Sequence, residues 1–426
     1  MDRRIEDFVR GLGLDAYLVG GAVRDELLGL DSKDADFVVP GVDYDGLRRA
    51  LEPHGNVEDF EVAGRRVGAR LYPRDRQVRA AAPAGIEFAP PRAERSTGPG
   101  RHDFVIVADP SLSIEDDMAR RDFTVNAIAK RLDTGELVDP FEGQRDLENG
   151  VLRAVSRRSF AEDPLRILRG LRLVSQRGLI PDAPTLQQMR DEAGNVQLVS
   201  GERLGDELAK LLLGRQPARA LRLARDTGVL TELLPELDPR VQEHTFTVVQ
   251  AAADAGASLA VRLAALLHDS GKPTAPVEQH AARGAELADQ ALERLRYPAR
   301  LRTYVVRLIR AHAFHLDHVD EQFARRFLRE HGDDLAFDLV THKHADLAGK
   351  GRQERERAAE RLRELLEQER TQPHRLADLA VDGSDLIELG YREGPELGRT
   401  LESLLDAVVD DPSLNTREQL LERARR

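Results

Sequence analysis

The sequence predicts an α+β fold in which a head that contains a sheet is followed by a long helical body. Four short apolar runs bounded by Gly, Pro or Asp predict strands in the first third of the chain, at residues 17–19, 35–39, 69–72 and 104–107. From about residue 115 onward, helix-forming residues dominate, and apolar side chains recur at intervals of three and four, as at Leu165, Leu168 and Leu171. A chain of 426 residues is long enough for several domains.

Composition narrows the classes of protein to which the chain can belong. Charged residues make up 32% of it, and no uncharged apolar run approaches the ~20 residues of a membrane span. The N-terminal segment mixes acids with bases, unlike a signal peptide, so we expect a cytoplasmic protein that binds no membrane. Cysteine is absent, which excludes disulfides and thiolate chemistry. The net charge of −12 argues mildly against nucleic-acid binding, although a local basic face is sufficient for it.

Residues 17–39 (YLVGGAVRDELLGLDSKDADFVV) contain the pattern of a phosphate site. The first strand ends at Gly20 and Gly21, where the absence of side chains lets a triphosphate approach the backbone N–H groups. The next helix begins at the same place and carries Arg24. We therefore expect the triphosphate of a nucleotide to bind at this turn.

Two carboxylates follow in the same segment. Asp34 and Asp36 flank Ala35 on a predicted strand, so both side chains lie on one face while Ala35 points into the core. Paired carboxylates of this kind are typical ligands of a hard divalent ion that also binds phosphate oxygens. An isolated Asp-x-Asp is usually a solvated turn or edge, but this pair follows the Gly-Gly turn and an arginine.

Three further blocks follow in a fixed order: SIEDDMARRDFTVNAIA (113–129), FEGQRDLENGVLRAV (141–155) and AEDPLRILRGLRL (161–173). Together with residues 17–39, they resemble the class II CCA-adding enzymes and bacterial poly(A) polymerases, a family of nucleotidyltransferases. The resemblance covers about the first 175 residues. It implies a small, polymerase-β-like mixed sheet in the head and a helical neck. It also implies that the chain adds or repairs the 3′-terminal CCA of tRNA from CTP and ATP.

The resemblance implies a role for each residue that matches these blocks. Asp34 and Asp36 would be catalytic and would bind Mg²⁺, with one ion activating the RNA 3′-hydroxyl and one holding the nucleotide phosphates. Glu87 is a candidate third carboxylate on a neighbouring strand. The implied nucleotide-binding residues are Gly21, Arg24, Arg121, Asp163, Arg166, Arg169 and Arg172.

Two pairs of residues also have a purely structural interpretation. Asp163 followed by Pro164 is a favourable start for a helix. In the functional interpretation, Asp163 and Arg166 hydrogen-bond the Watson–Crick edge of cytosine or adenine. Asp122 and Asn126 lie four residues apart on a predicted helix and therefore face the same side. They belong either to the nucleotide site or to an N-cap and a buried amide.

Residues 244–346 contain a second set of potential metal ligands. LAALLHDSGKP places His268 and Asp269 at the end of an apolar helix, and the other members are His244, His280, His312 and Asp346. This set resembles the HD phosphohydrolase superfamily, although Ser270 stands where that superfamily usually has an aliphatic residue. Imidazole and carboxylate ligands suit a transition metal such as Ni, Mn, Co or Fe. The resemblance implies phosphatase or 2′,3′-cyclic phosphodiesterase activity; the alternative is an HD fold without metal.

We therefore expect a nucleotidyltransferase head at residues 1–145, a helical neck at 146–240, an HD domain at 241–348 and a helical tail at 349–426. CC-adding, A-adding and poly(A)-adding enzymes share these motifs. Residues 92–100 (RAERSTGPG), within a stretch expected to be mobile (80–100), resemble the segment with which full CCA-adding enzymes switch from C to A. The rivals from other classes are an HD phosphohydrolase whose head only binds nucleotide and a non-catalytic RNA-binding protein.

Overall fold

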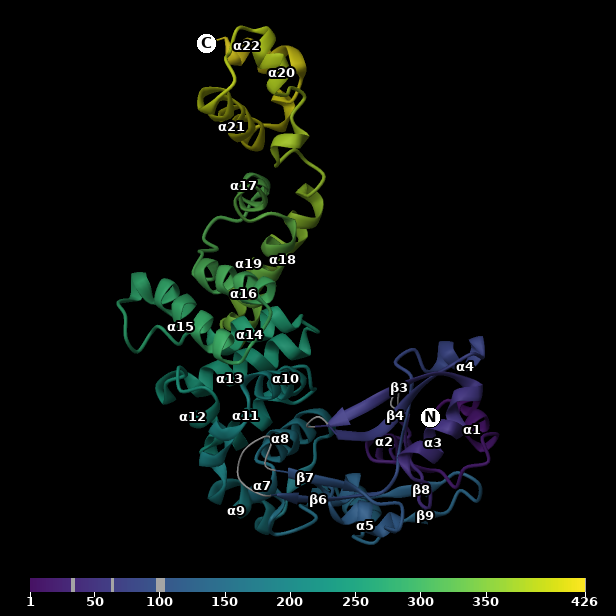
Figure 1. Ribbon diagram of the computed structural model, residues 1–426. Coiled ribbons are helices and arrows are strands. Elements are labelled where there is room, and N and C mark those ends of the chain that lie inside the picture. Colours follow the sequence, from purple (N-terminus) through teal and green to yellow (C-terminus); the bar gives the residue numbers. More distant parts are fainter. Residues whose placement is uncertain (32–34, 63–64, 97–103, 426) are drawn as a thin grey trace. The chain divides into compact units, whose positions relative to one another are not determined.

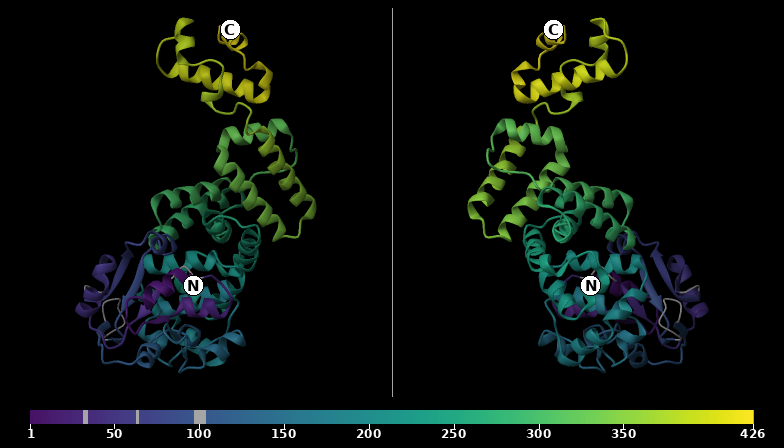
Figure 2. Two further views of the ribbon diagram at one scale, coloured as in Figure 1. Left: turned by 90° about the vertical axis from the view of Figure 1, so that its right-hand side faces the viewer. Right: turned by 90° about the vertical axis from the view of Figure 1, so that its left-hand side faces the viewer.

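The computed structural model describes residues 1–31, 35–62, 65–96 and 104–425. The chain forms two compact units, Met1–Pro235 and Glu236–Arg426, which are described separately. All the strands of the described residues lie in the first unit, whereas the second unit is helical (Figures 1 and 2). The expected fold class is confirmed: a mixed sheet in the head is followed by a helical body. Among the described residues, no helix is long and apolar enough to cross a membrane.

The head contains a seven-stranded sheet with the order β3-β4-β5-β2-β1-β8-β9 in its described residues. Strand β2 runs parallel to β5, and the other neighbouring strands pair antiparallel. The strands are β1 (Tyr17–Val19), β2 (Asp36–Val38), β3 (Gly55–Val62), β4 (Arg65–Pro73), β5 (Ile86–Ala89), β8 (Ala129–Arg131) and β9 (Leu137–Val138). The head helices are α1 (Arg3–Arg10), α2 (Gly21–Leu27), α3 (Tyr44–Leu51), α4 (Arg76–Ala81), α5 (Ile114–Ala119) and α6 (Gly143–Glu148). A separate ribbon pairs β6 (Arg92–Ser96) with β7 (Phe104–Ala108).

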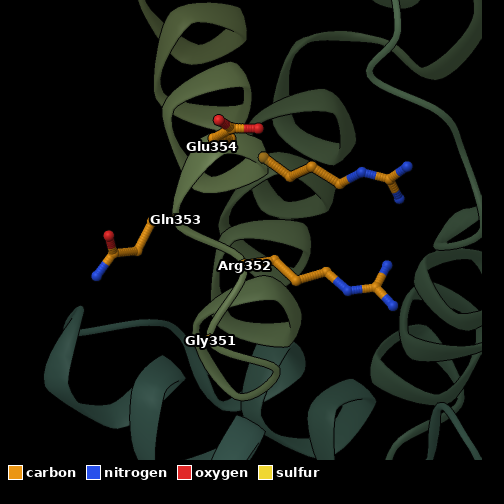
Figure 3. A pocket seen from close by; sticks show the side chains of 5 residues that line it. Gly351, Arg352, Gln353 and Glu354 are labelled. Carbon is orange, nitrogen blue, oxygen red and sulfur yellow. The ribbon is translucent and has the colours of Figure 1, made fainter.

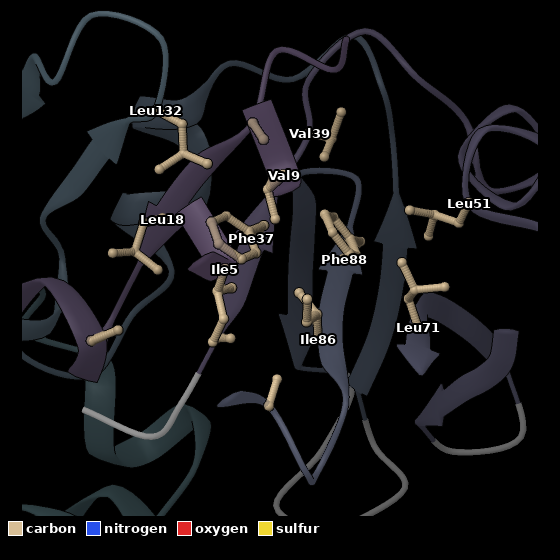
Figure 4. Close-up of a cluster of buried hydrophobic side chains, with 14 of the residues drawn as sticks. Ile5, Val9, Leu18, Phe37, Val39, Leu51, Leu71, Ile86, Phe88 and Leu132 are labelled. Carbon is tan, nitrogen blue, oxygen red and sulfur yellow. The ribbon is translucent and has the colours of Figure 1, made fainter. Parts of the chain in front are cut away.

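The main core of the head fixes the register of the strand that carries Asp36. Phe37 is buried against Phe88 of β5, and the two rings stack with their centroids 5.4 Å apart (Figure 4). Ile5 and Val9 of α1 lie in the same cluster. Because neighbouring side chains of a strand point to opposite faces, burial of Phe37 places Asp36 on the other face, where it is exposed.

Two expectations about the head need correction. The stretch at residues 80–100, expected to be mobile, contains the strand expected at Glu87: β5 lies between β4 and β2 and buries Ile86 and Phe88. The alternation of Ile86, Glu87 and Phe88 is a strand pattern only four residues long, and the surrounding Ala, Pro and Gly conceal it. Strands also continue beyond residue 115, since β8 and β9 complete the other edge of the sheet.

The neck packs a long helix closely against the end of the head. Its elements are β10 (Val151–Leu152), α7 (Ser159–Glu162), α8 (Leu165–Arg177), β11 (Ile180–Pro181), α9 (Ala183–Asp191), α10 (Gly201–Leu212), α11 (Pro217–Asp226) and α12 (Val229–Leu233). Helix α8 contacts α10 and α11 on one side. On another side, a Cβ atom at Gly170 of α8 would lie 2.8 Å from the ring of Phe123 and 2.8 Å from Met189. The absence of a side chain at Gly170 therefore permits this close approach.

The second unit consists of helices, in which α14 and α18 contact each other and both contact α13 and α16. It contains α13 (Pro239–Asp254), α14 (Leu259–Leu267), α15 (His280–Arg294), α16 (Ala299–Ala311), α17 (Glu321–His331), α18 (Asp333–Ala348), α19 (Gln353–Glu369), α20 (Gly383–Glu388), α21 (Pro395–Asp410) and α22 (Arg417–Ala424). The last three helices share a small apolar core that includes Leu386, Leu404 and Leu420. Short 3₁₀ helices occur at Glu52–His54, Thr124–Asn126, Ala193–Leu198, Val277–Gln279, Leu376–Asp378 and Pro412–Leu414.

Candidate active site and metal centre

The carboxylates of the head lie where β2 and β5 run side by side. Asp36 of β2 and Glu87 of β5 are register partners in this parallel pair, so their side chains leave the sheet on the same face. Glu87 accepts a hydrogen bond of 3.1 Å from Arg70 Nε on β4. Asp34, the other predicted catalytic carboxylate, lies outside the described residues. The structure thus brings together Asp36 and Glu87, the carboxylate that the sequence suggested as a third.

The turn between β1 and α2 is lined by a guanidinium group. Gly20 has a φ of +72°, which an L side chain rarely adopts, and a Cβ atom there would lie 2.8 Å from Arg121 Nη1. Arg121 is held by buried Asp117 at 3.0 Å. A Cβ atom at Gly21 would have Arg24 Nη2 as its nearest neighbour, at 3.4 Å. The predicted residues Gly21, Arg24 and Arg121 therefore surround one glycine turn.

A chain of hydrogen bonds joins this turn to the neck. Arg24 Nη1 donates to Asn126 Oδ1 at 2.5 Å, and Asn126 Nδ2 donates to Asp122 Oδ1 at 3.0 Å. The other oxygen of Asp122 accepts from Arg169 Nε of α8 at 2.6 Å. Asp122, which is 4% exposed, thus connects α2 of the head with α8 of the neck.

The expectation that Asp122 and Asn126 share a helix is wrong. Helix α5 ends at Ala119, and Asn126 belongs to a short 3₁₀ helix, Thr124–Asn126. Between them the backbone pairs like a strand: Thr124 N–H donates to the carbonyl of Arg153, and the carbonyl of Asp122 accepts from Val155. This pairing replaces helical hydrogen bonds. The two side chains nevertheless meet, because the turn of 3₁₀ helix brings Asn126 back over Asp122.

Asp122 is ionised in spite of its burial. Burial by itself raises the pKa of a carboxyl group, but the charge of Arg169 and the hydrogen bond from Asn126 outweigh it, so the pKa of Asp122 lies well below its usual range. The same ion pair raises the pKa of Arg169 above its usual value. The side chain of Arg169 is 38% exposed to solvent, so water partly screens the ion pair with Asp122.

The beginning of α8 has the geometry of a cap, with one oxygen of Asp163 engaged elsewhere. Asp163 Oδ1 accepts from the backbone N–H of Leu165 at 3.1 Å, whereas Oδ2 accepts from Arg203 Nη2 of α10 at 3.0 Å. Arg166 is buried and donates to Ser159 Oγ at 3.1 Å. The capping interaction expected from the sequence is present, and it leaves the second oxygen of Asp163 available to a side-chain donor.

The last predicted arginine of α8 has a buried carboxylate partner. Arg172 Nη1 lies 2.9 Å from an oxygen of Glu207 on α10. Burial lowers the pKa of Arg172, and the charge of Glu207 opposes that shift. Glu207 and Arg203 were not predicted from the sequence. Their spacing of four residues on an amphipathic helix would have placed them on one face.

The six residues predicted for the HD centre come together from five parts of the second unit. His244 lies on α13, His268 and Asp269 follow α14, His280 begins α15, His312 follows α16, and Asp346 lies on α18. Within the described part of the chain, they form two groups: His244, His268 and Asp346, and Asp269, His280 and His312. In each group, one donor atom per residue lies within 4.8 Å of the others.

The imidazole rings are oriented by the backbone. His268 Nδ1 donates to the carbonyl of Ala265 at 2.9 Å, and His312 Nδ1 donates to the carbonyl of Ile309 at 2.6 Å. His280 Nδ1 donates in the same way to the carbonyl of Val277. A carbonyl only accepts, so each of these rings donates through Nδ1, and its Nε2 faces other donor atoms of the centre. This is how metal-binding histidines are held by their outer partners.

The donor atoms of the centre fit a divalent metal ion. His268 Nε2 lies 3.2 Å from Asp269 Oδ1 and 3.6 Å from Asp346 Oδ1, yet His268 Nε2 and Asp269 Oδ1 are buried without a hydrogen-bond partner among the described residues. Two ionised carboxylates face these imidazoles, and the pKa values of Asp269 and Asp346 lie well below the usual range although burial opposes the shift. A borderline metal such as Ni²⁺, Mn²⁺ or Co²⁺ prefers this mixture of donors.

Lysine side chains and the histidines balance the charge of the centre. Lys272 Nζ lies 2.7 Å from Asp269, and Lys350 Nζ lies 2.7 Å from Asp346. Burial lowers the pKa of His268, but the two carboxylates outweigh it and raise the pKa to about 9. Burial lowers the pKa of His312 to about 3, so that ring is neutral. Acidic residues of the centre are thus matched by nearby cations.

One histidine of this region was not predicted from the sequence. His342 on α18 is 1% exposed, and its ring centroid lies 5.0 Å from that of His268 and 5.7 Å from that of His312. Neither of its ring nitrogens has a hydrogen-bond partner among the described residues. A signal was present in the sequence, because His342 and Asp346 are four residues apart and therefore share a helix face.

An open pocket of about 440 Å³ lies elsewhere, at the start of α19. It is lined by residues 351–355, and Figure 3 shows the side chain of Arg352 extending away from the helix on the side opposite Gln353. Neither ligand group includes any of these residues.

The features of the first unit define a nucleotidyltransferase head, in which a glycine turn with arginines stands beside carboxylates on neighbouring strands; the second unit adds an HD-type cluster. Three protein-family models match successive parts of the chain. The Poly A polymerase head domain matches residues 16–153, the family described as "Probable RNA and SrmB- binding site of polymerase A" matches 178–240, and the HD domain matches 241–380.

Relatives along most of the chain extend this match. The multifunctional CCA protein of Ralstonia nicotianae is 38% identical over 328 residues, which cover 70% of this chain and 72% of that protein. The multifunctional CCA protein of Azoarcus sp. is 41% identical over 320 residues, or 70% and 73% of the two chains. The chain therefore belongs to the family of multifunctional CCA proteins, and the family expected from the sequence is confirmed.

Solved structures agree with this assignment. The CCA-adding enzyme of Bacillus stearothermophilus, in complex with CTP, superposes with a TM-score of 0.74 at 26% identity, over 99% of this chain and 96% of that one. The CCA-adding enzyme of Thermotoga maritima, complexed with tRNA, has the same fold: its TM-score is 0.63 at 23% identity, over 99% and 93% of the two chains.

Proposed function

We propose that the chain adds or repairs the 3′-terminal CCA of tRNA, with CTP and ATP as substrates. The observation that carries this proposal is the pairing of Asp36 with Glu87 beside the Gly20–Gly21 turn, in a chain that is 38% and 41% identical to two multifunctional CCA proteins. Proteins with these domains generally use divalent metals, and oxygen donors next to a triphosphate site suit Mg²⁺.

Asp34 and Asp36 are the proposed catalytic residues and Mg²⁺ ligands. When bound there, Mg²⁺ would make the RNA 3′-hydroxyl more acidic and neutralise phosphate charge. Asp36 extends from a short strand that Phe37 anchors in the core, which holds its carboxylate in place. Glu87 on the adjacent strand supports the same site, while Arg70 holds Glu87.

The proposed triphosphate site is formed by Gly21, Arg24 and Arg121. The guanidinium of Arg121 lies against the turn, where it offers positive charge next to open backbone N–H groups. Arg24 is buried and bonded to Asn126, so its role is to fix the position of the turn as much as to attract phosphate.

The proposed base-selecting residues lie at the start of α8. Asp163 accepts hydrogen bonds and Arg166 donates them, and together they match the edge of cytosine or adenine. The capping bond to Leu165 and the bond from Arg203 hold the Asp163 carboxylate in a defined orientation. Arg169 and Arg172, bonded to Asp122 and Glu207, tie the helix to its neighbours and place it relative to the incoming nucleotide; this is supported by their carboxylate partners.

The experiment that tests the proposal uses a tRNA transcript that ends at the discriminator base. Wild-type protein is incubated with CTP, ATP or both, and the products are read at single-nucleotide resolution. Growth by three residues with both nucleotides supports the proposal. Growth that stops at two residues identifies a CC-adding enzyme, a single A an A-adding enzyme, and a long A-tail a poly(A) polymerase. Absence of growth in a folded protein leaves the HD phosphohydrolase with a nucleotide-binding head.

We further propose that the second unit is a metal-dependent phosphohydrolase. The observation in favour is the convergence of six predicted ligands into two groups whose buried donor atoms face one another. When bound, a divalent transition metal would polarise a phosphoryl oxygen and supply a nucleophilic water. Hydrolysis of a 2′,3′-cyclic phosphate and of a phosphomonoester should be assayed with Ni²⁺, Mn²⁺ and Co²⁺. No hydrolysis with any of these metals would make this unit structural.

The four-part domain division stays a proposal. Boundaries at residues 1–145, 146–240, 241–348 and 349–426 agree with the sequence blocks, and the separate core of α20–α22 supports an independent tail. Limited proteolysis with mass spectrometry would locate the exposed connections. Protection of α19 together with α18, which it contacts, would move the third boundary toward residue 380.

A further inference from the structure

One buried histidine of the second unit is not explained by packing or by hydrogen bonding. His342 lies on α18 one turn before Asp346, so the two side chains project from the same face of the helix. Its ring is 5.0 Å from the ring of His268, in one ligand group, and 5.7 Å from the ring of His312, in the other. His342 thus borders both groups.

The surroundings of His342 give its nitrogens nothing to bind. The side chain is 1% exposed, and neither Nδ1 nor Nε2 has a hydrogen-bond partner among the described residues. Buried polar groups nearly always have a partner, because an unpaired one loses its hydration without compensation. His268 and His312 differ from His342, since each of them has at least one partnered nitrogen and donates Nδ1–H to a backbone carbonyl.

The same helix carries a second histidine that is exposed to solvent and has a partner. His344, two residues further on, faces outward: its side chain is 38% exposed and lies 3.5 Å from Glu360. His342 instead has both ring nitrogens buried without a partner among the described residues, and its ring lies against two histidines of the ligand groups. His342 therefore has the chemistry of a ligand, and His344 that of a surface residue.

We propose that His342 is a further nitrogen ligand of the HD-domain metal centre, next to His268 and His312. The proposal rests on the metal centre proposed above and adds a fifth imidazole to His244, His268, His280 and His312. A centre with five imidazoles and two carboxylates favours nitrogen-loving divalent ions such as Ni²⁺, Co²⁺ and Zn²⁺ over Mg²⁺.

The first test measures metal binding to the full chain after removal of metal with a chelator. His342→Leu keeps the volume of the side chain and removes both nitrogens, and His344→Leu on the same helix is the matched control. Ni²⁺ is titrated by calorimetry, and Co²⁺ is followed by its visible absorption, which reports the ligand set. We expect His342→Leu to weaken Ni²⁺ binding about 10- to 100-fold or to remove one equivalent, and to change the Co²⁺ spectrum. His344→Leu should leave both unchanged.

The second test separates a ligand from a packing residue by thermal unfolding. Without metal, His342→Leu should melt at the wild-type temperature or above it, because it removes an unpartnered polar group. The rise in melting temperature on addition of Ni²⁺ should be smaller than in wild type. A variant that loses stability without metal and keeps the full Ni²⁺ response would overturn the proposal, as would wild-type Ni²⁺ affinity or an unchanged Co²⁺ spectrum.

Two controls make every result decisive. If wild type binds neither Ni²⁺ nor Co²⁺, the metal centre itself is refuted, and the His342 proposal with it. If His342→Leu does not fold, His342→Gln retains a polar group of similar reach, and it should fold and still bind Ni²⁺ more weakly than wild type. Wild-type binding by a folded His342→Gln would show that His342 is not a ligand.

Discussion

Asp36 in the first unit and Asp346 in the second are both proposed metal ligands, but their surroundings differ. Asp36 is an exposed residue at the start of a three-residue strand, beside another carboxylate. Asp346 is a buried residue in the middle of the second unit's helices, and it contacts His244 and Lys350. As proposed, the head centre would be completed by phosphate oxygens of the substrate, whereas the HD centre would be formed by nitrogen and oxygen donors of the chain itself.

This difference determines how each centre is linked to the stability of the fold. An exposed carboxylate held by its strand can be changed without disturbing the core. Four of the six residues of the HD centre, all but His244 and His280, are buried, so ligand binding and packing are coupled there. Substitutions at exposed and at buried residues of the two centres test whether activity and stability are separable in the head and coupled in the HD centre.

The largest effect is expected at the head centre. Asp36→Ala should lower nucleotide addition by about 10²- to 10³-fold or more, because it removes a group that acts on the reacting phosphate. Since Asp36 is exposed, the urea midpoint should stay that of wild type. Asp45→Ala, an exposed residue of α3, is the control and should keep its activity. Addition by Asp36→Ala at the wild-type rate would remove Asp36 from the catalytic site.

A substitution that removes the hydrolytic activity of the HD centre should leave nucleotide addition by the head unchanged. His268→Ala should lower metal-dependent hydrolysis of a 2′,3′-cyclic phosphate by about 100-fold, since ligand and outer-partner changes cost that much in metal affinity. CTP and ATP incorporation should be unchanged. His318→Ala, an exposed histidine, is the control. Loss of nucleotide addition in a folded His268→Ala protein would show that the centres are not independent.

Within the head, Asp122 should behave like a residue of the HD centre, because it is buried and charged. Asp122→Asn keeps the shape of the side chain but weakens the pair with Arg169, and we expect a loss of about 2 kcal/mol in the free energy of unfolding. Nucleotide addition should fall as well, since α8 loses its link to α2. Urea denaturation measures the first effect. A loss below about 0.5 kcal/mol, the size of a surface substitution, would show that the network is not structural.

The pH dependence of this loss has a definite sign. The pKa of Asp122 in the folded protein lies below its unfolded value, so the stabilisation is fully present above the unfolded value of about 4 and decreases as the pH falls below it. The difference in unfolding free energy between wild type and Asp122→Asn should therefore shrink between about pH 5 and pH 2. A difference that is constant over this range would mean that the charge of Asp122 does not contribute.

The smallest effect separates the two interpretations of Asp163. Asp163→Ala should cost about 1 kcal/mol of stability through loss of the capping bond to Leu165. Asp163→Asn keeps a good capping side chain but loses the carboxylate, so it should keep stability and lose the preference for CTP and ATP over UTP and GTP. Misincorporation assays measure this preference. Wild-type selectivity in Asp163→Asn would leave Asp163 as a cap.

The sequence alone predicted the parts of the molecule whose structure depends on neighbouring residues in the chain. The strand with Asp36, the Gly20–Gly21 turn and the end of the apolar helix at His268 are readable from hydrophobic pattern and spacing. The six dispersed HD residues were found through the resemblance, and the structure brings them together.

The parts that were not predicted depend on contacts between distant segments. A strand at Glu87 was expected from the resemblance, but its place in the sheet was not, because β5 is only four residues long and its position depends on pairing with β2 and β4. Residues 122–126 leave the helical path because their backbone pairs with residues 153–155. The partners of Arg169 and Arg172 and the burial of His342 likewise follow from tertiary packing, which no local pattern contains.

Gly170 lets the proposed base-selecting end of α8 lie close to the head. A side chain at that position would press on Phe123 and Met189, and any shift of α8 would carry Arg166 with it. If Asp163 and Arg166 select the base as proposed, discrimination between bases would depend on this apolar contact. A methyl group added in the core would then alter substrate choice while every polar residue of the site is retained.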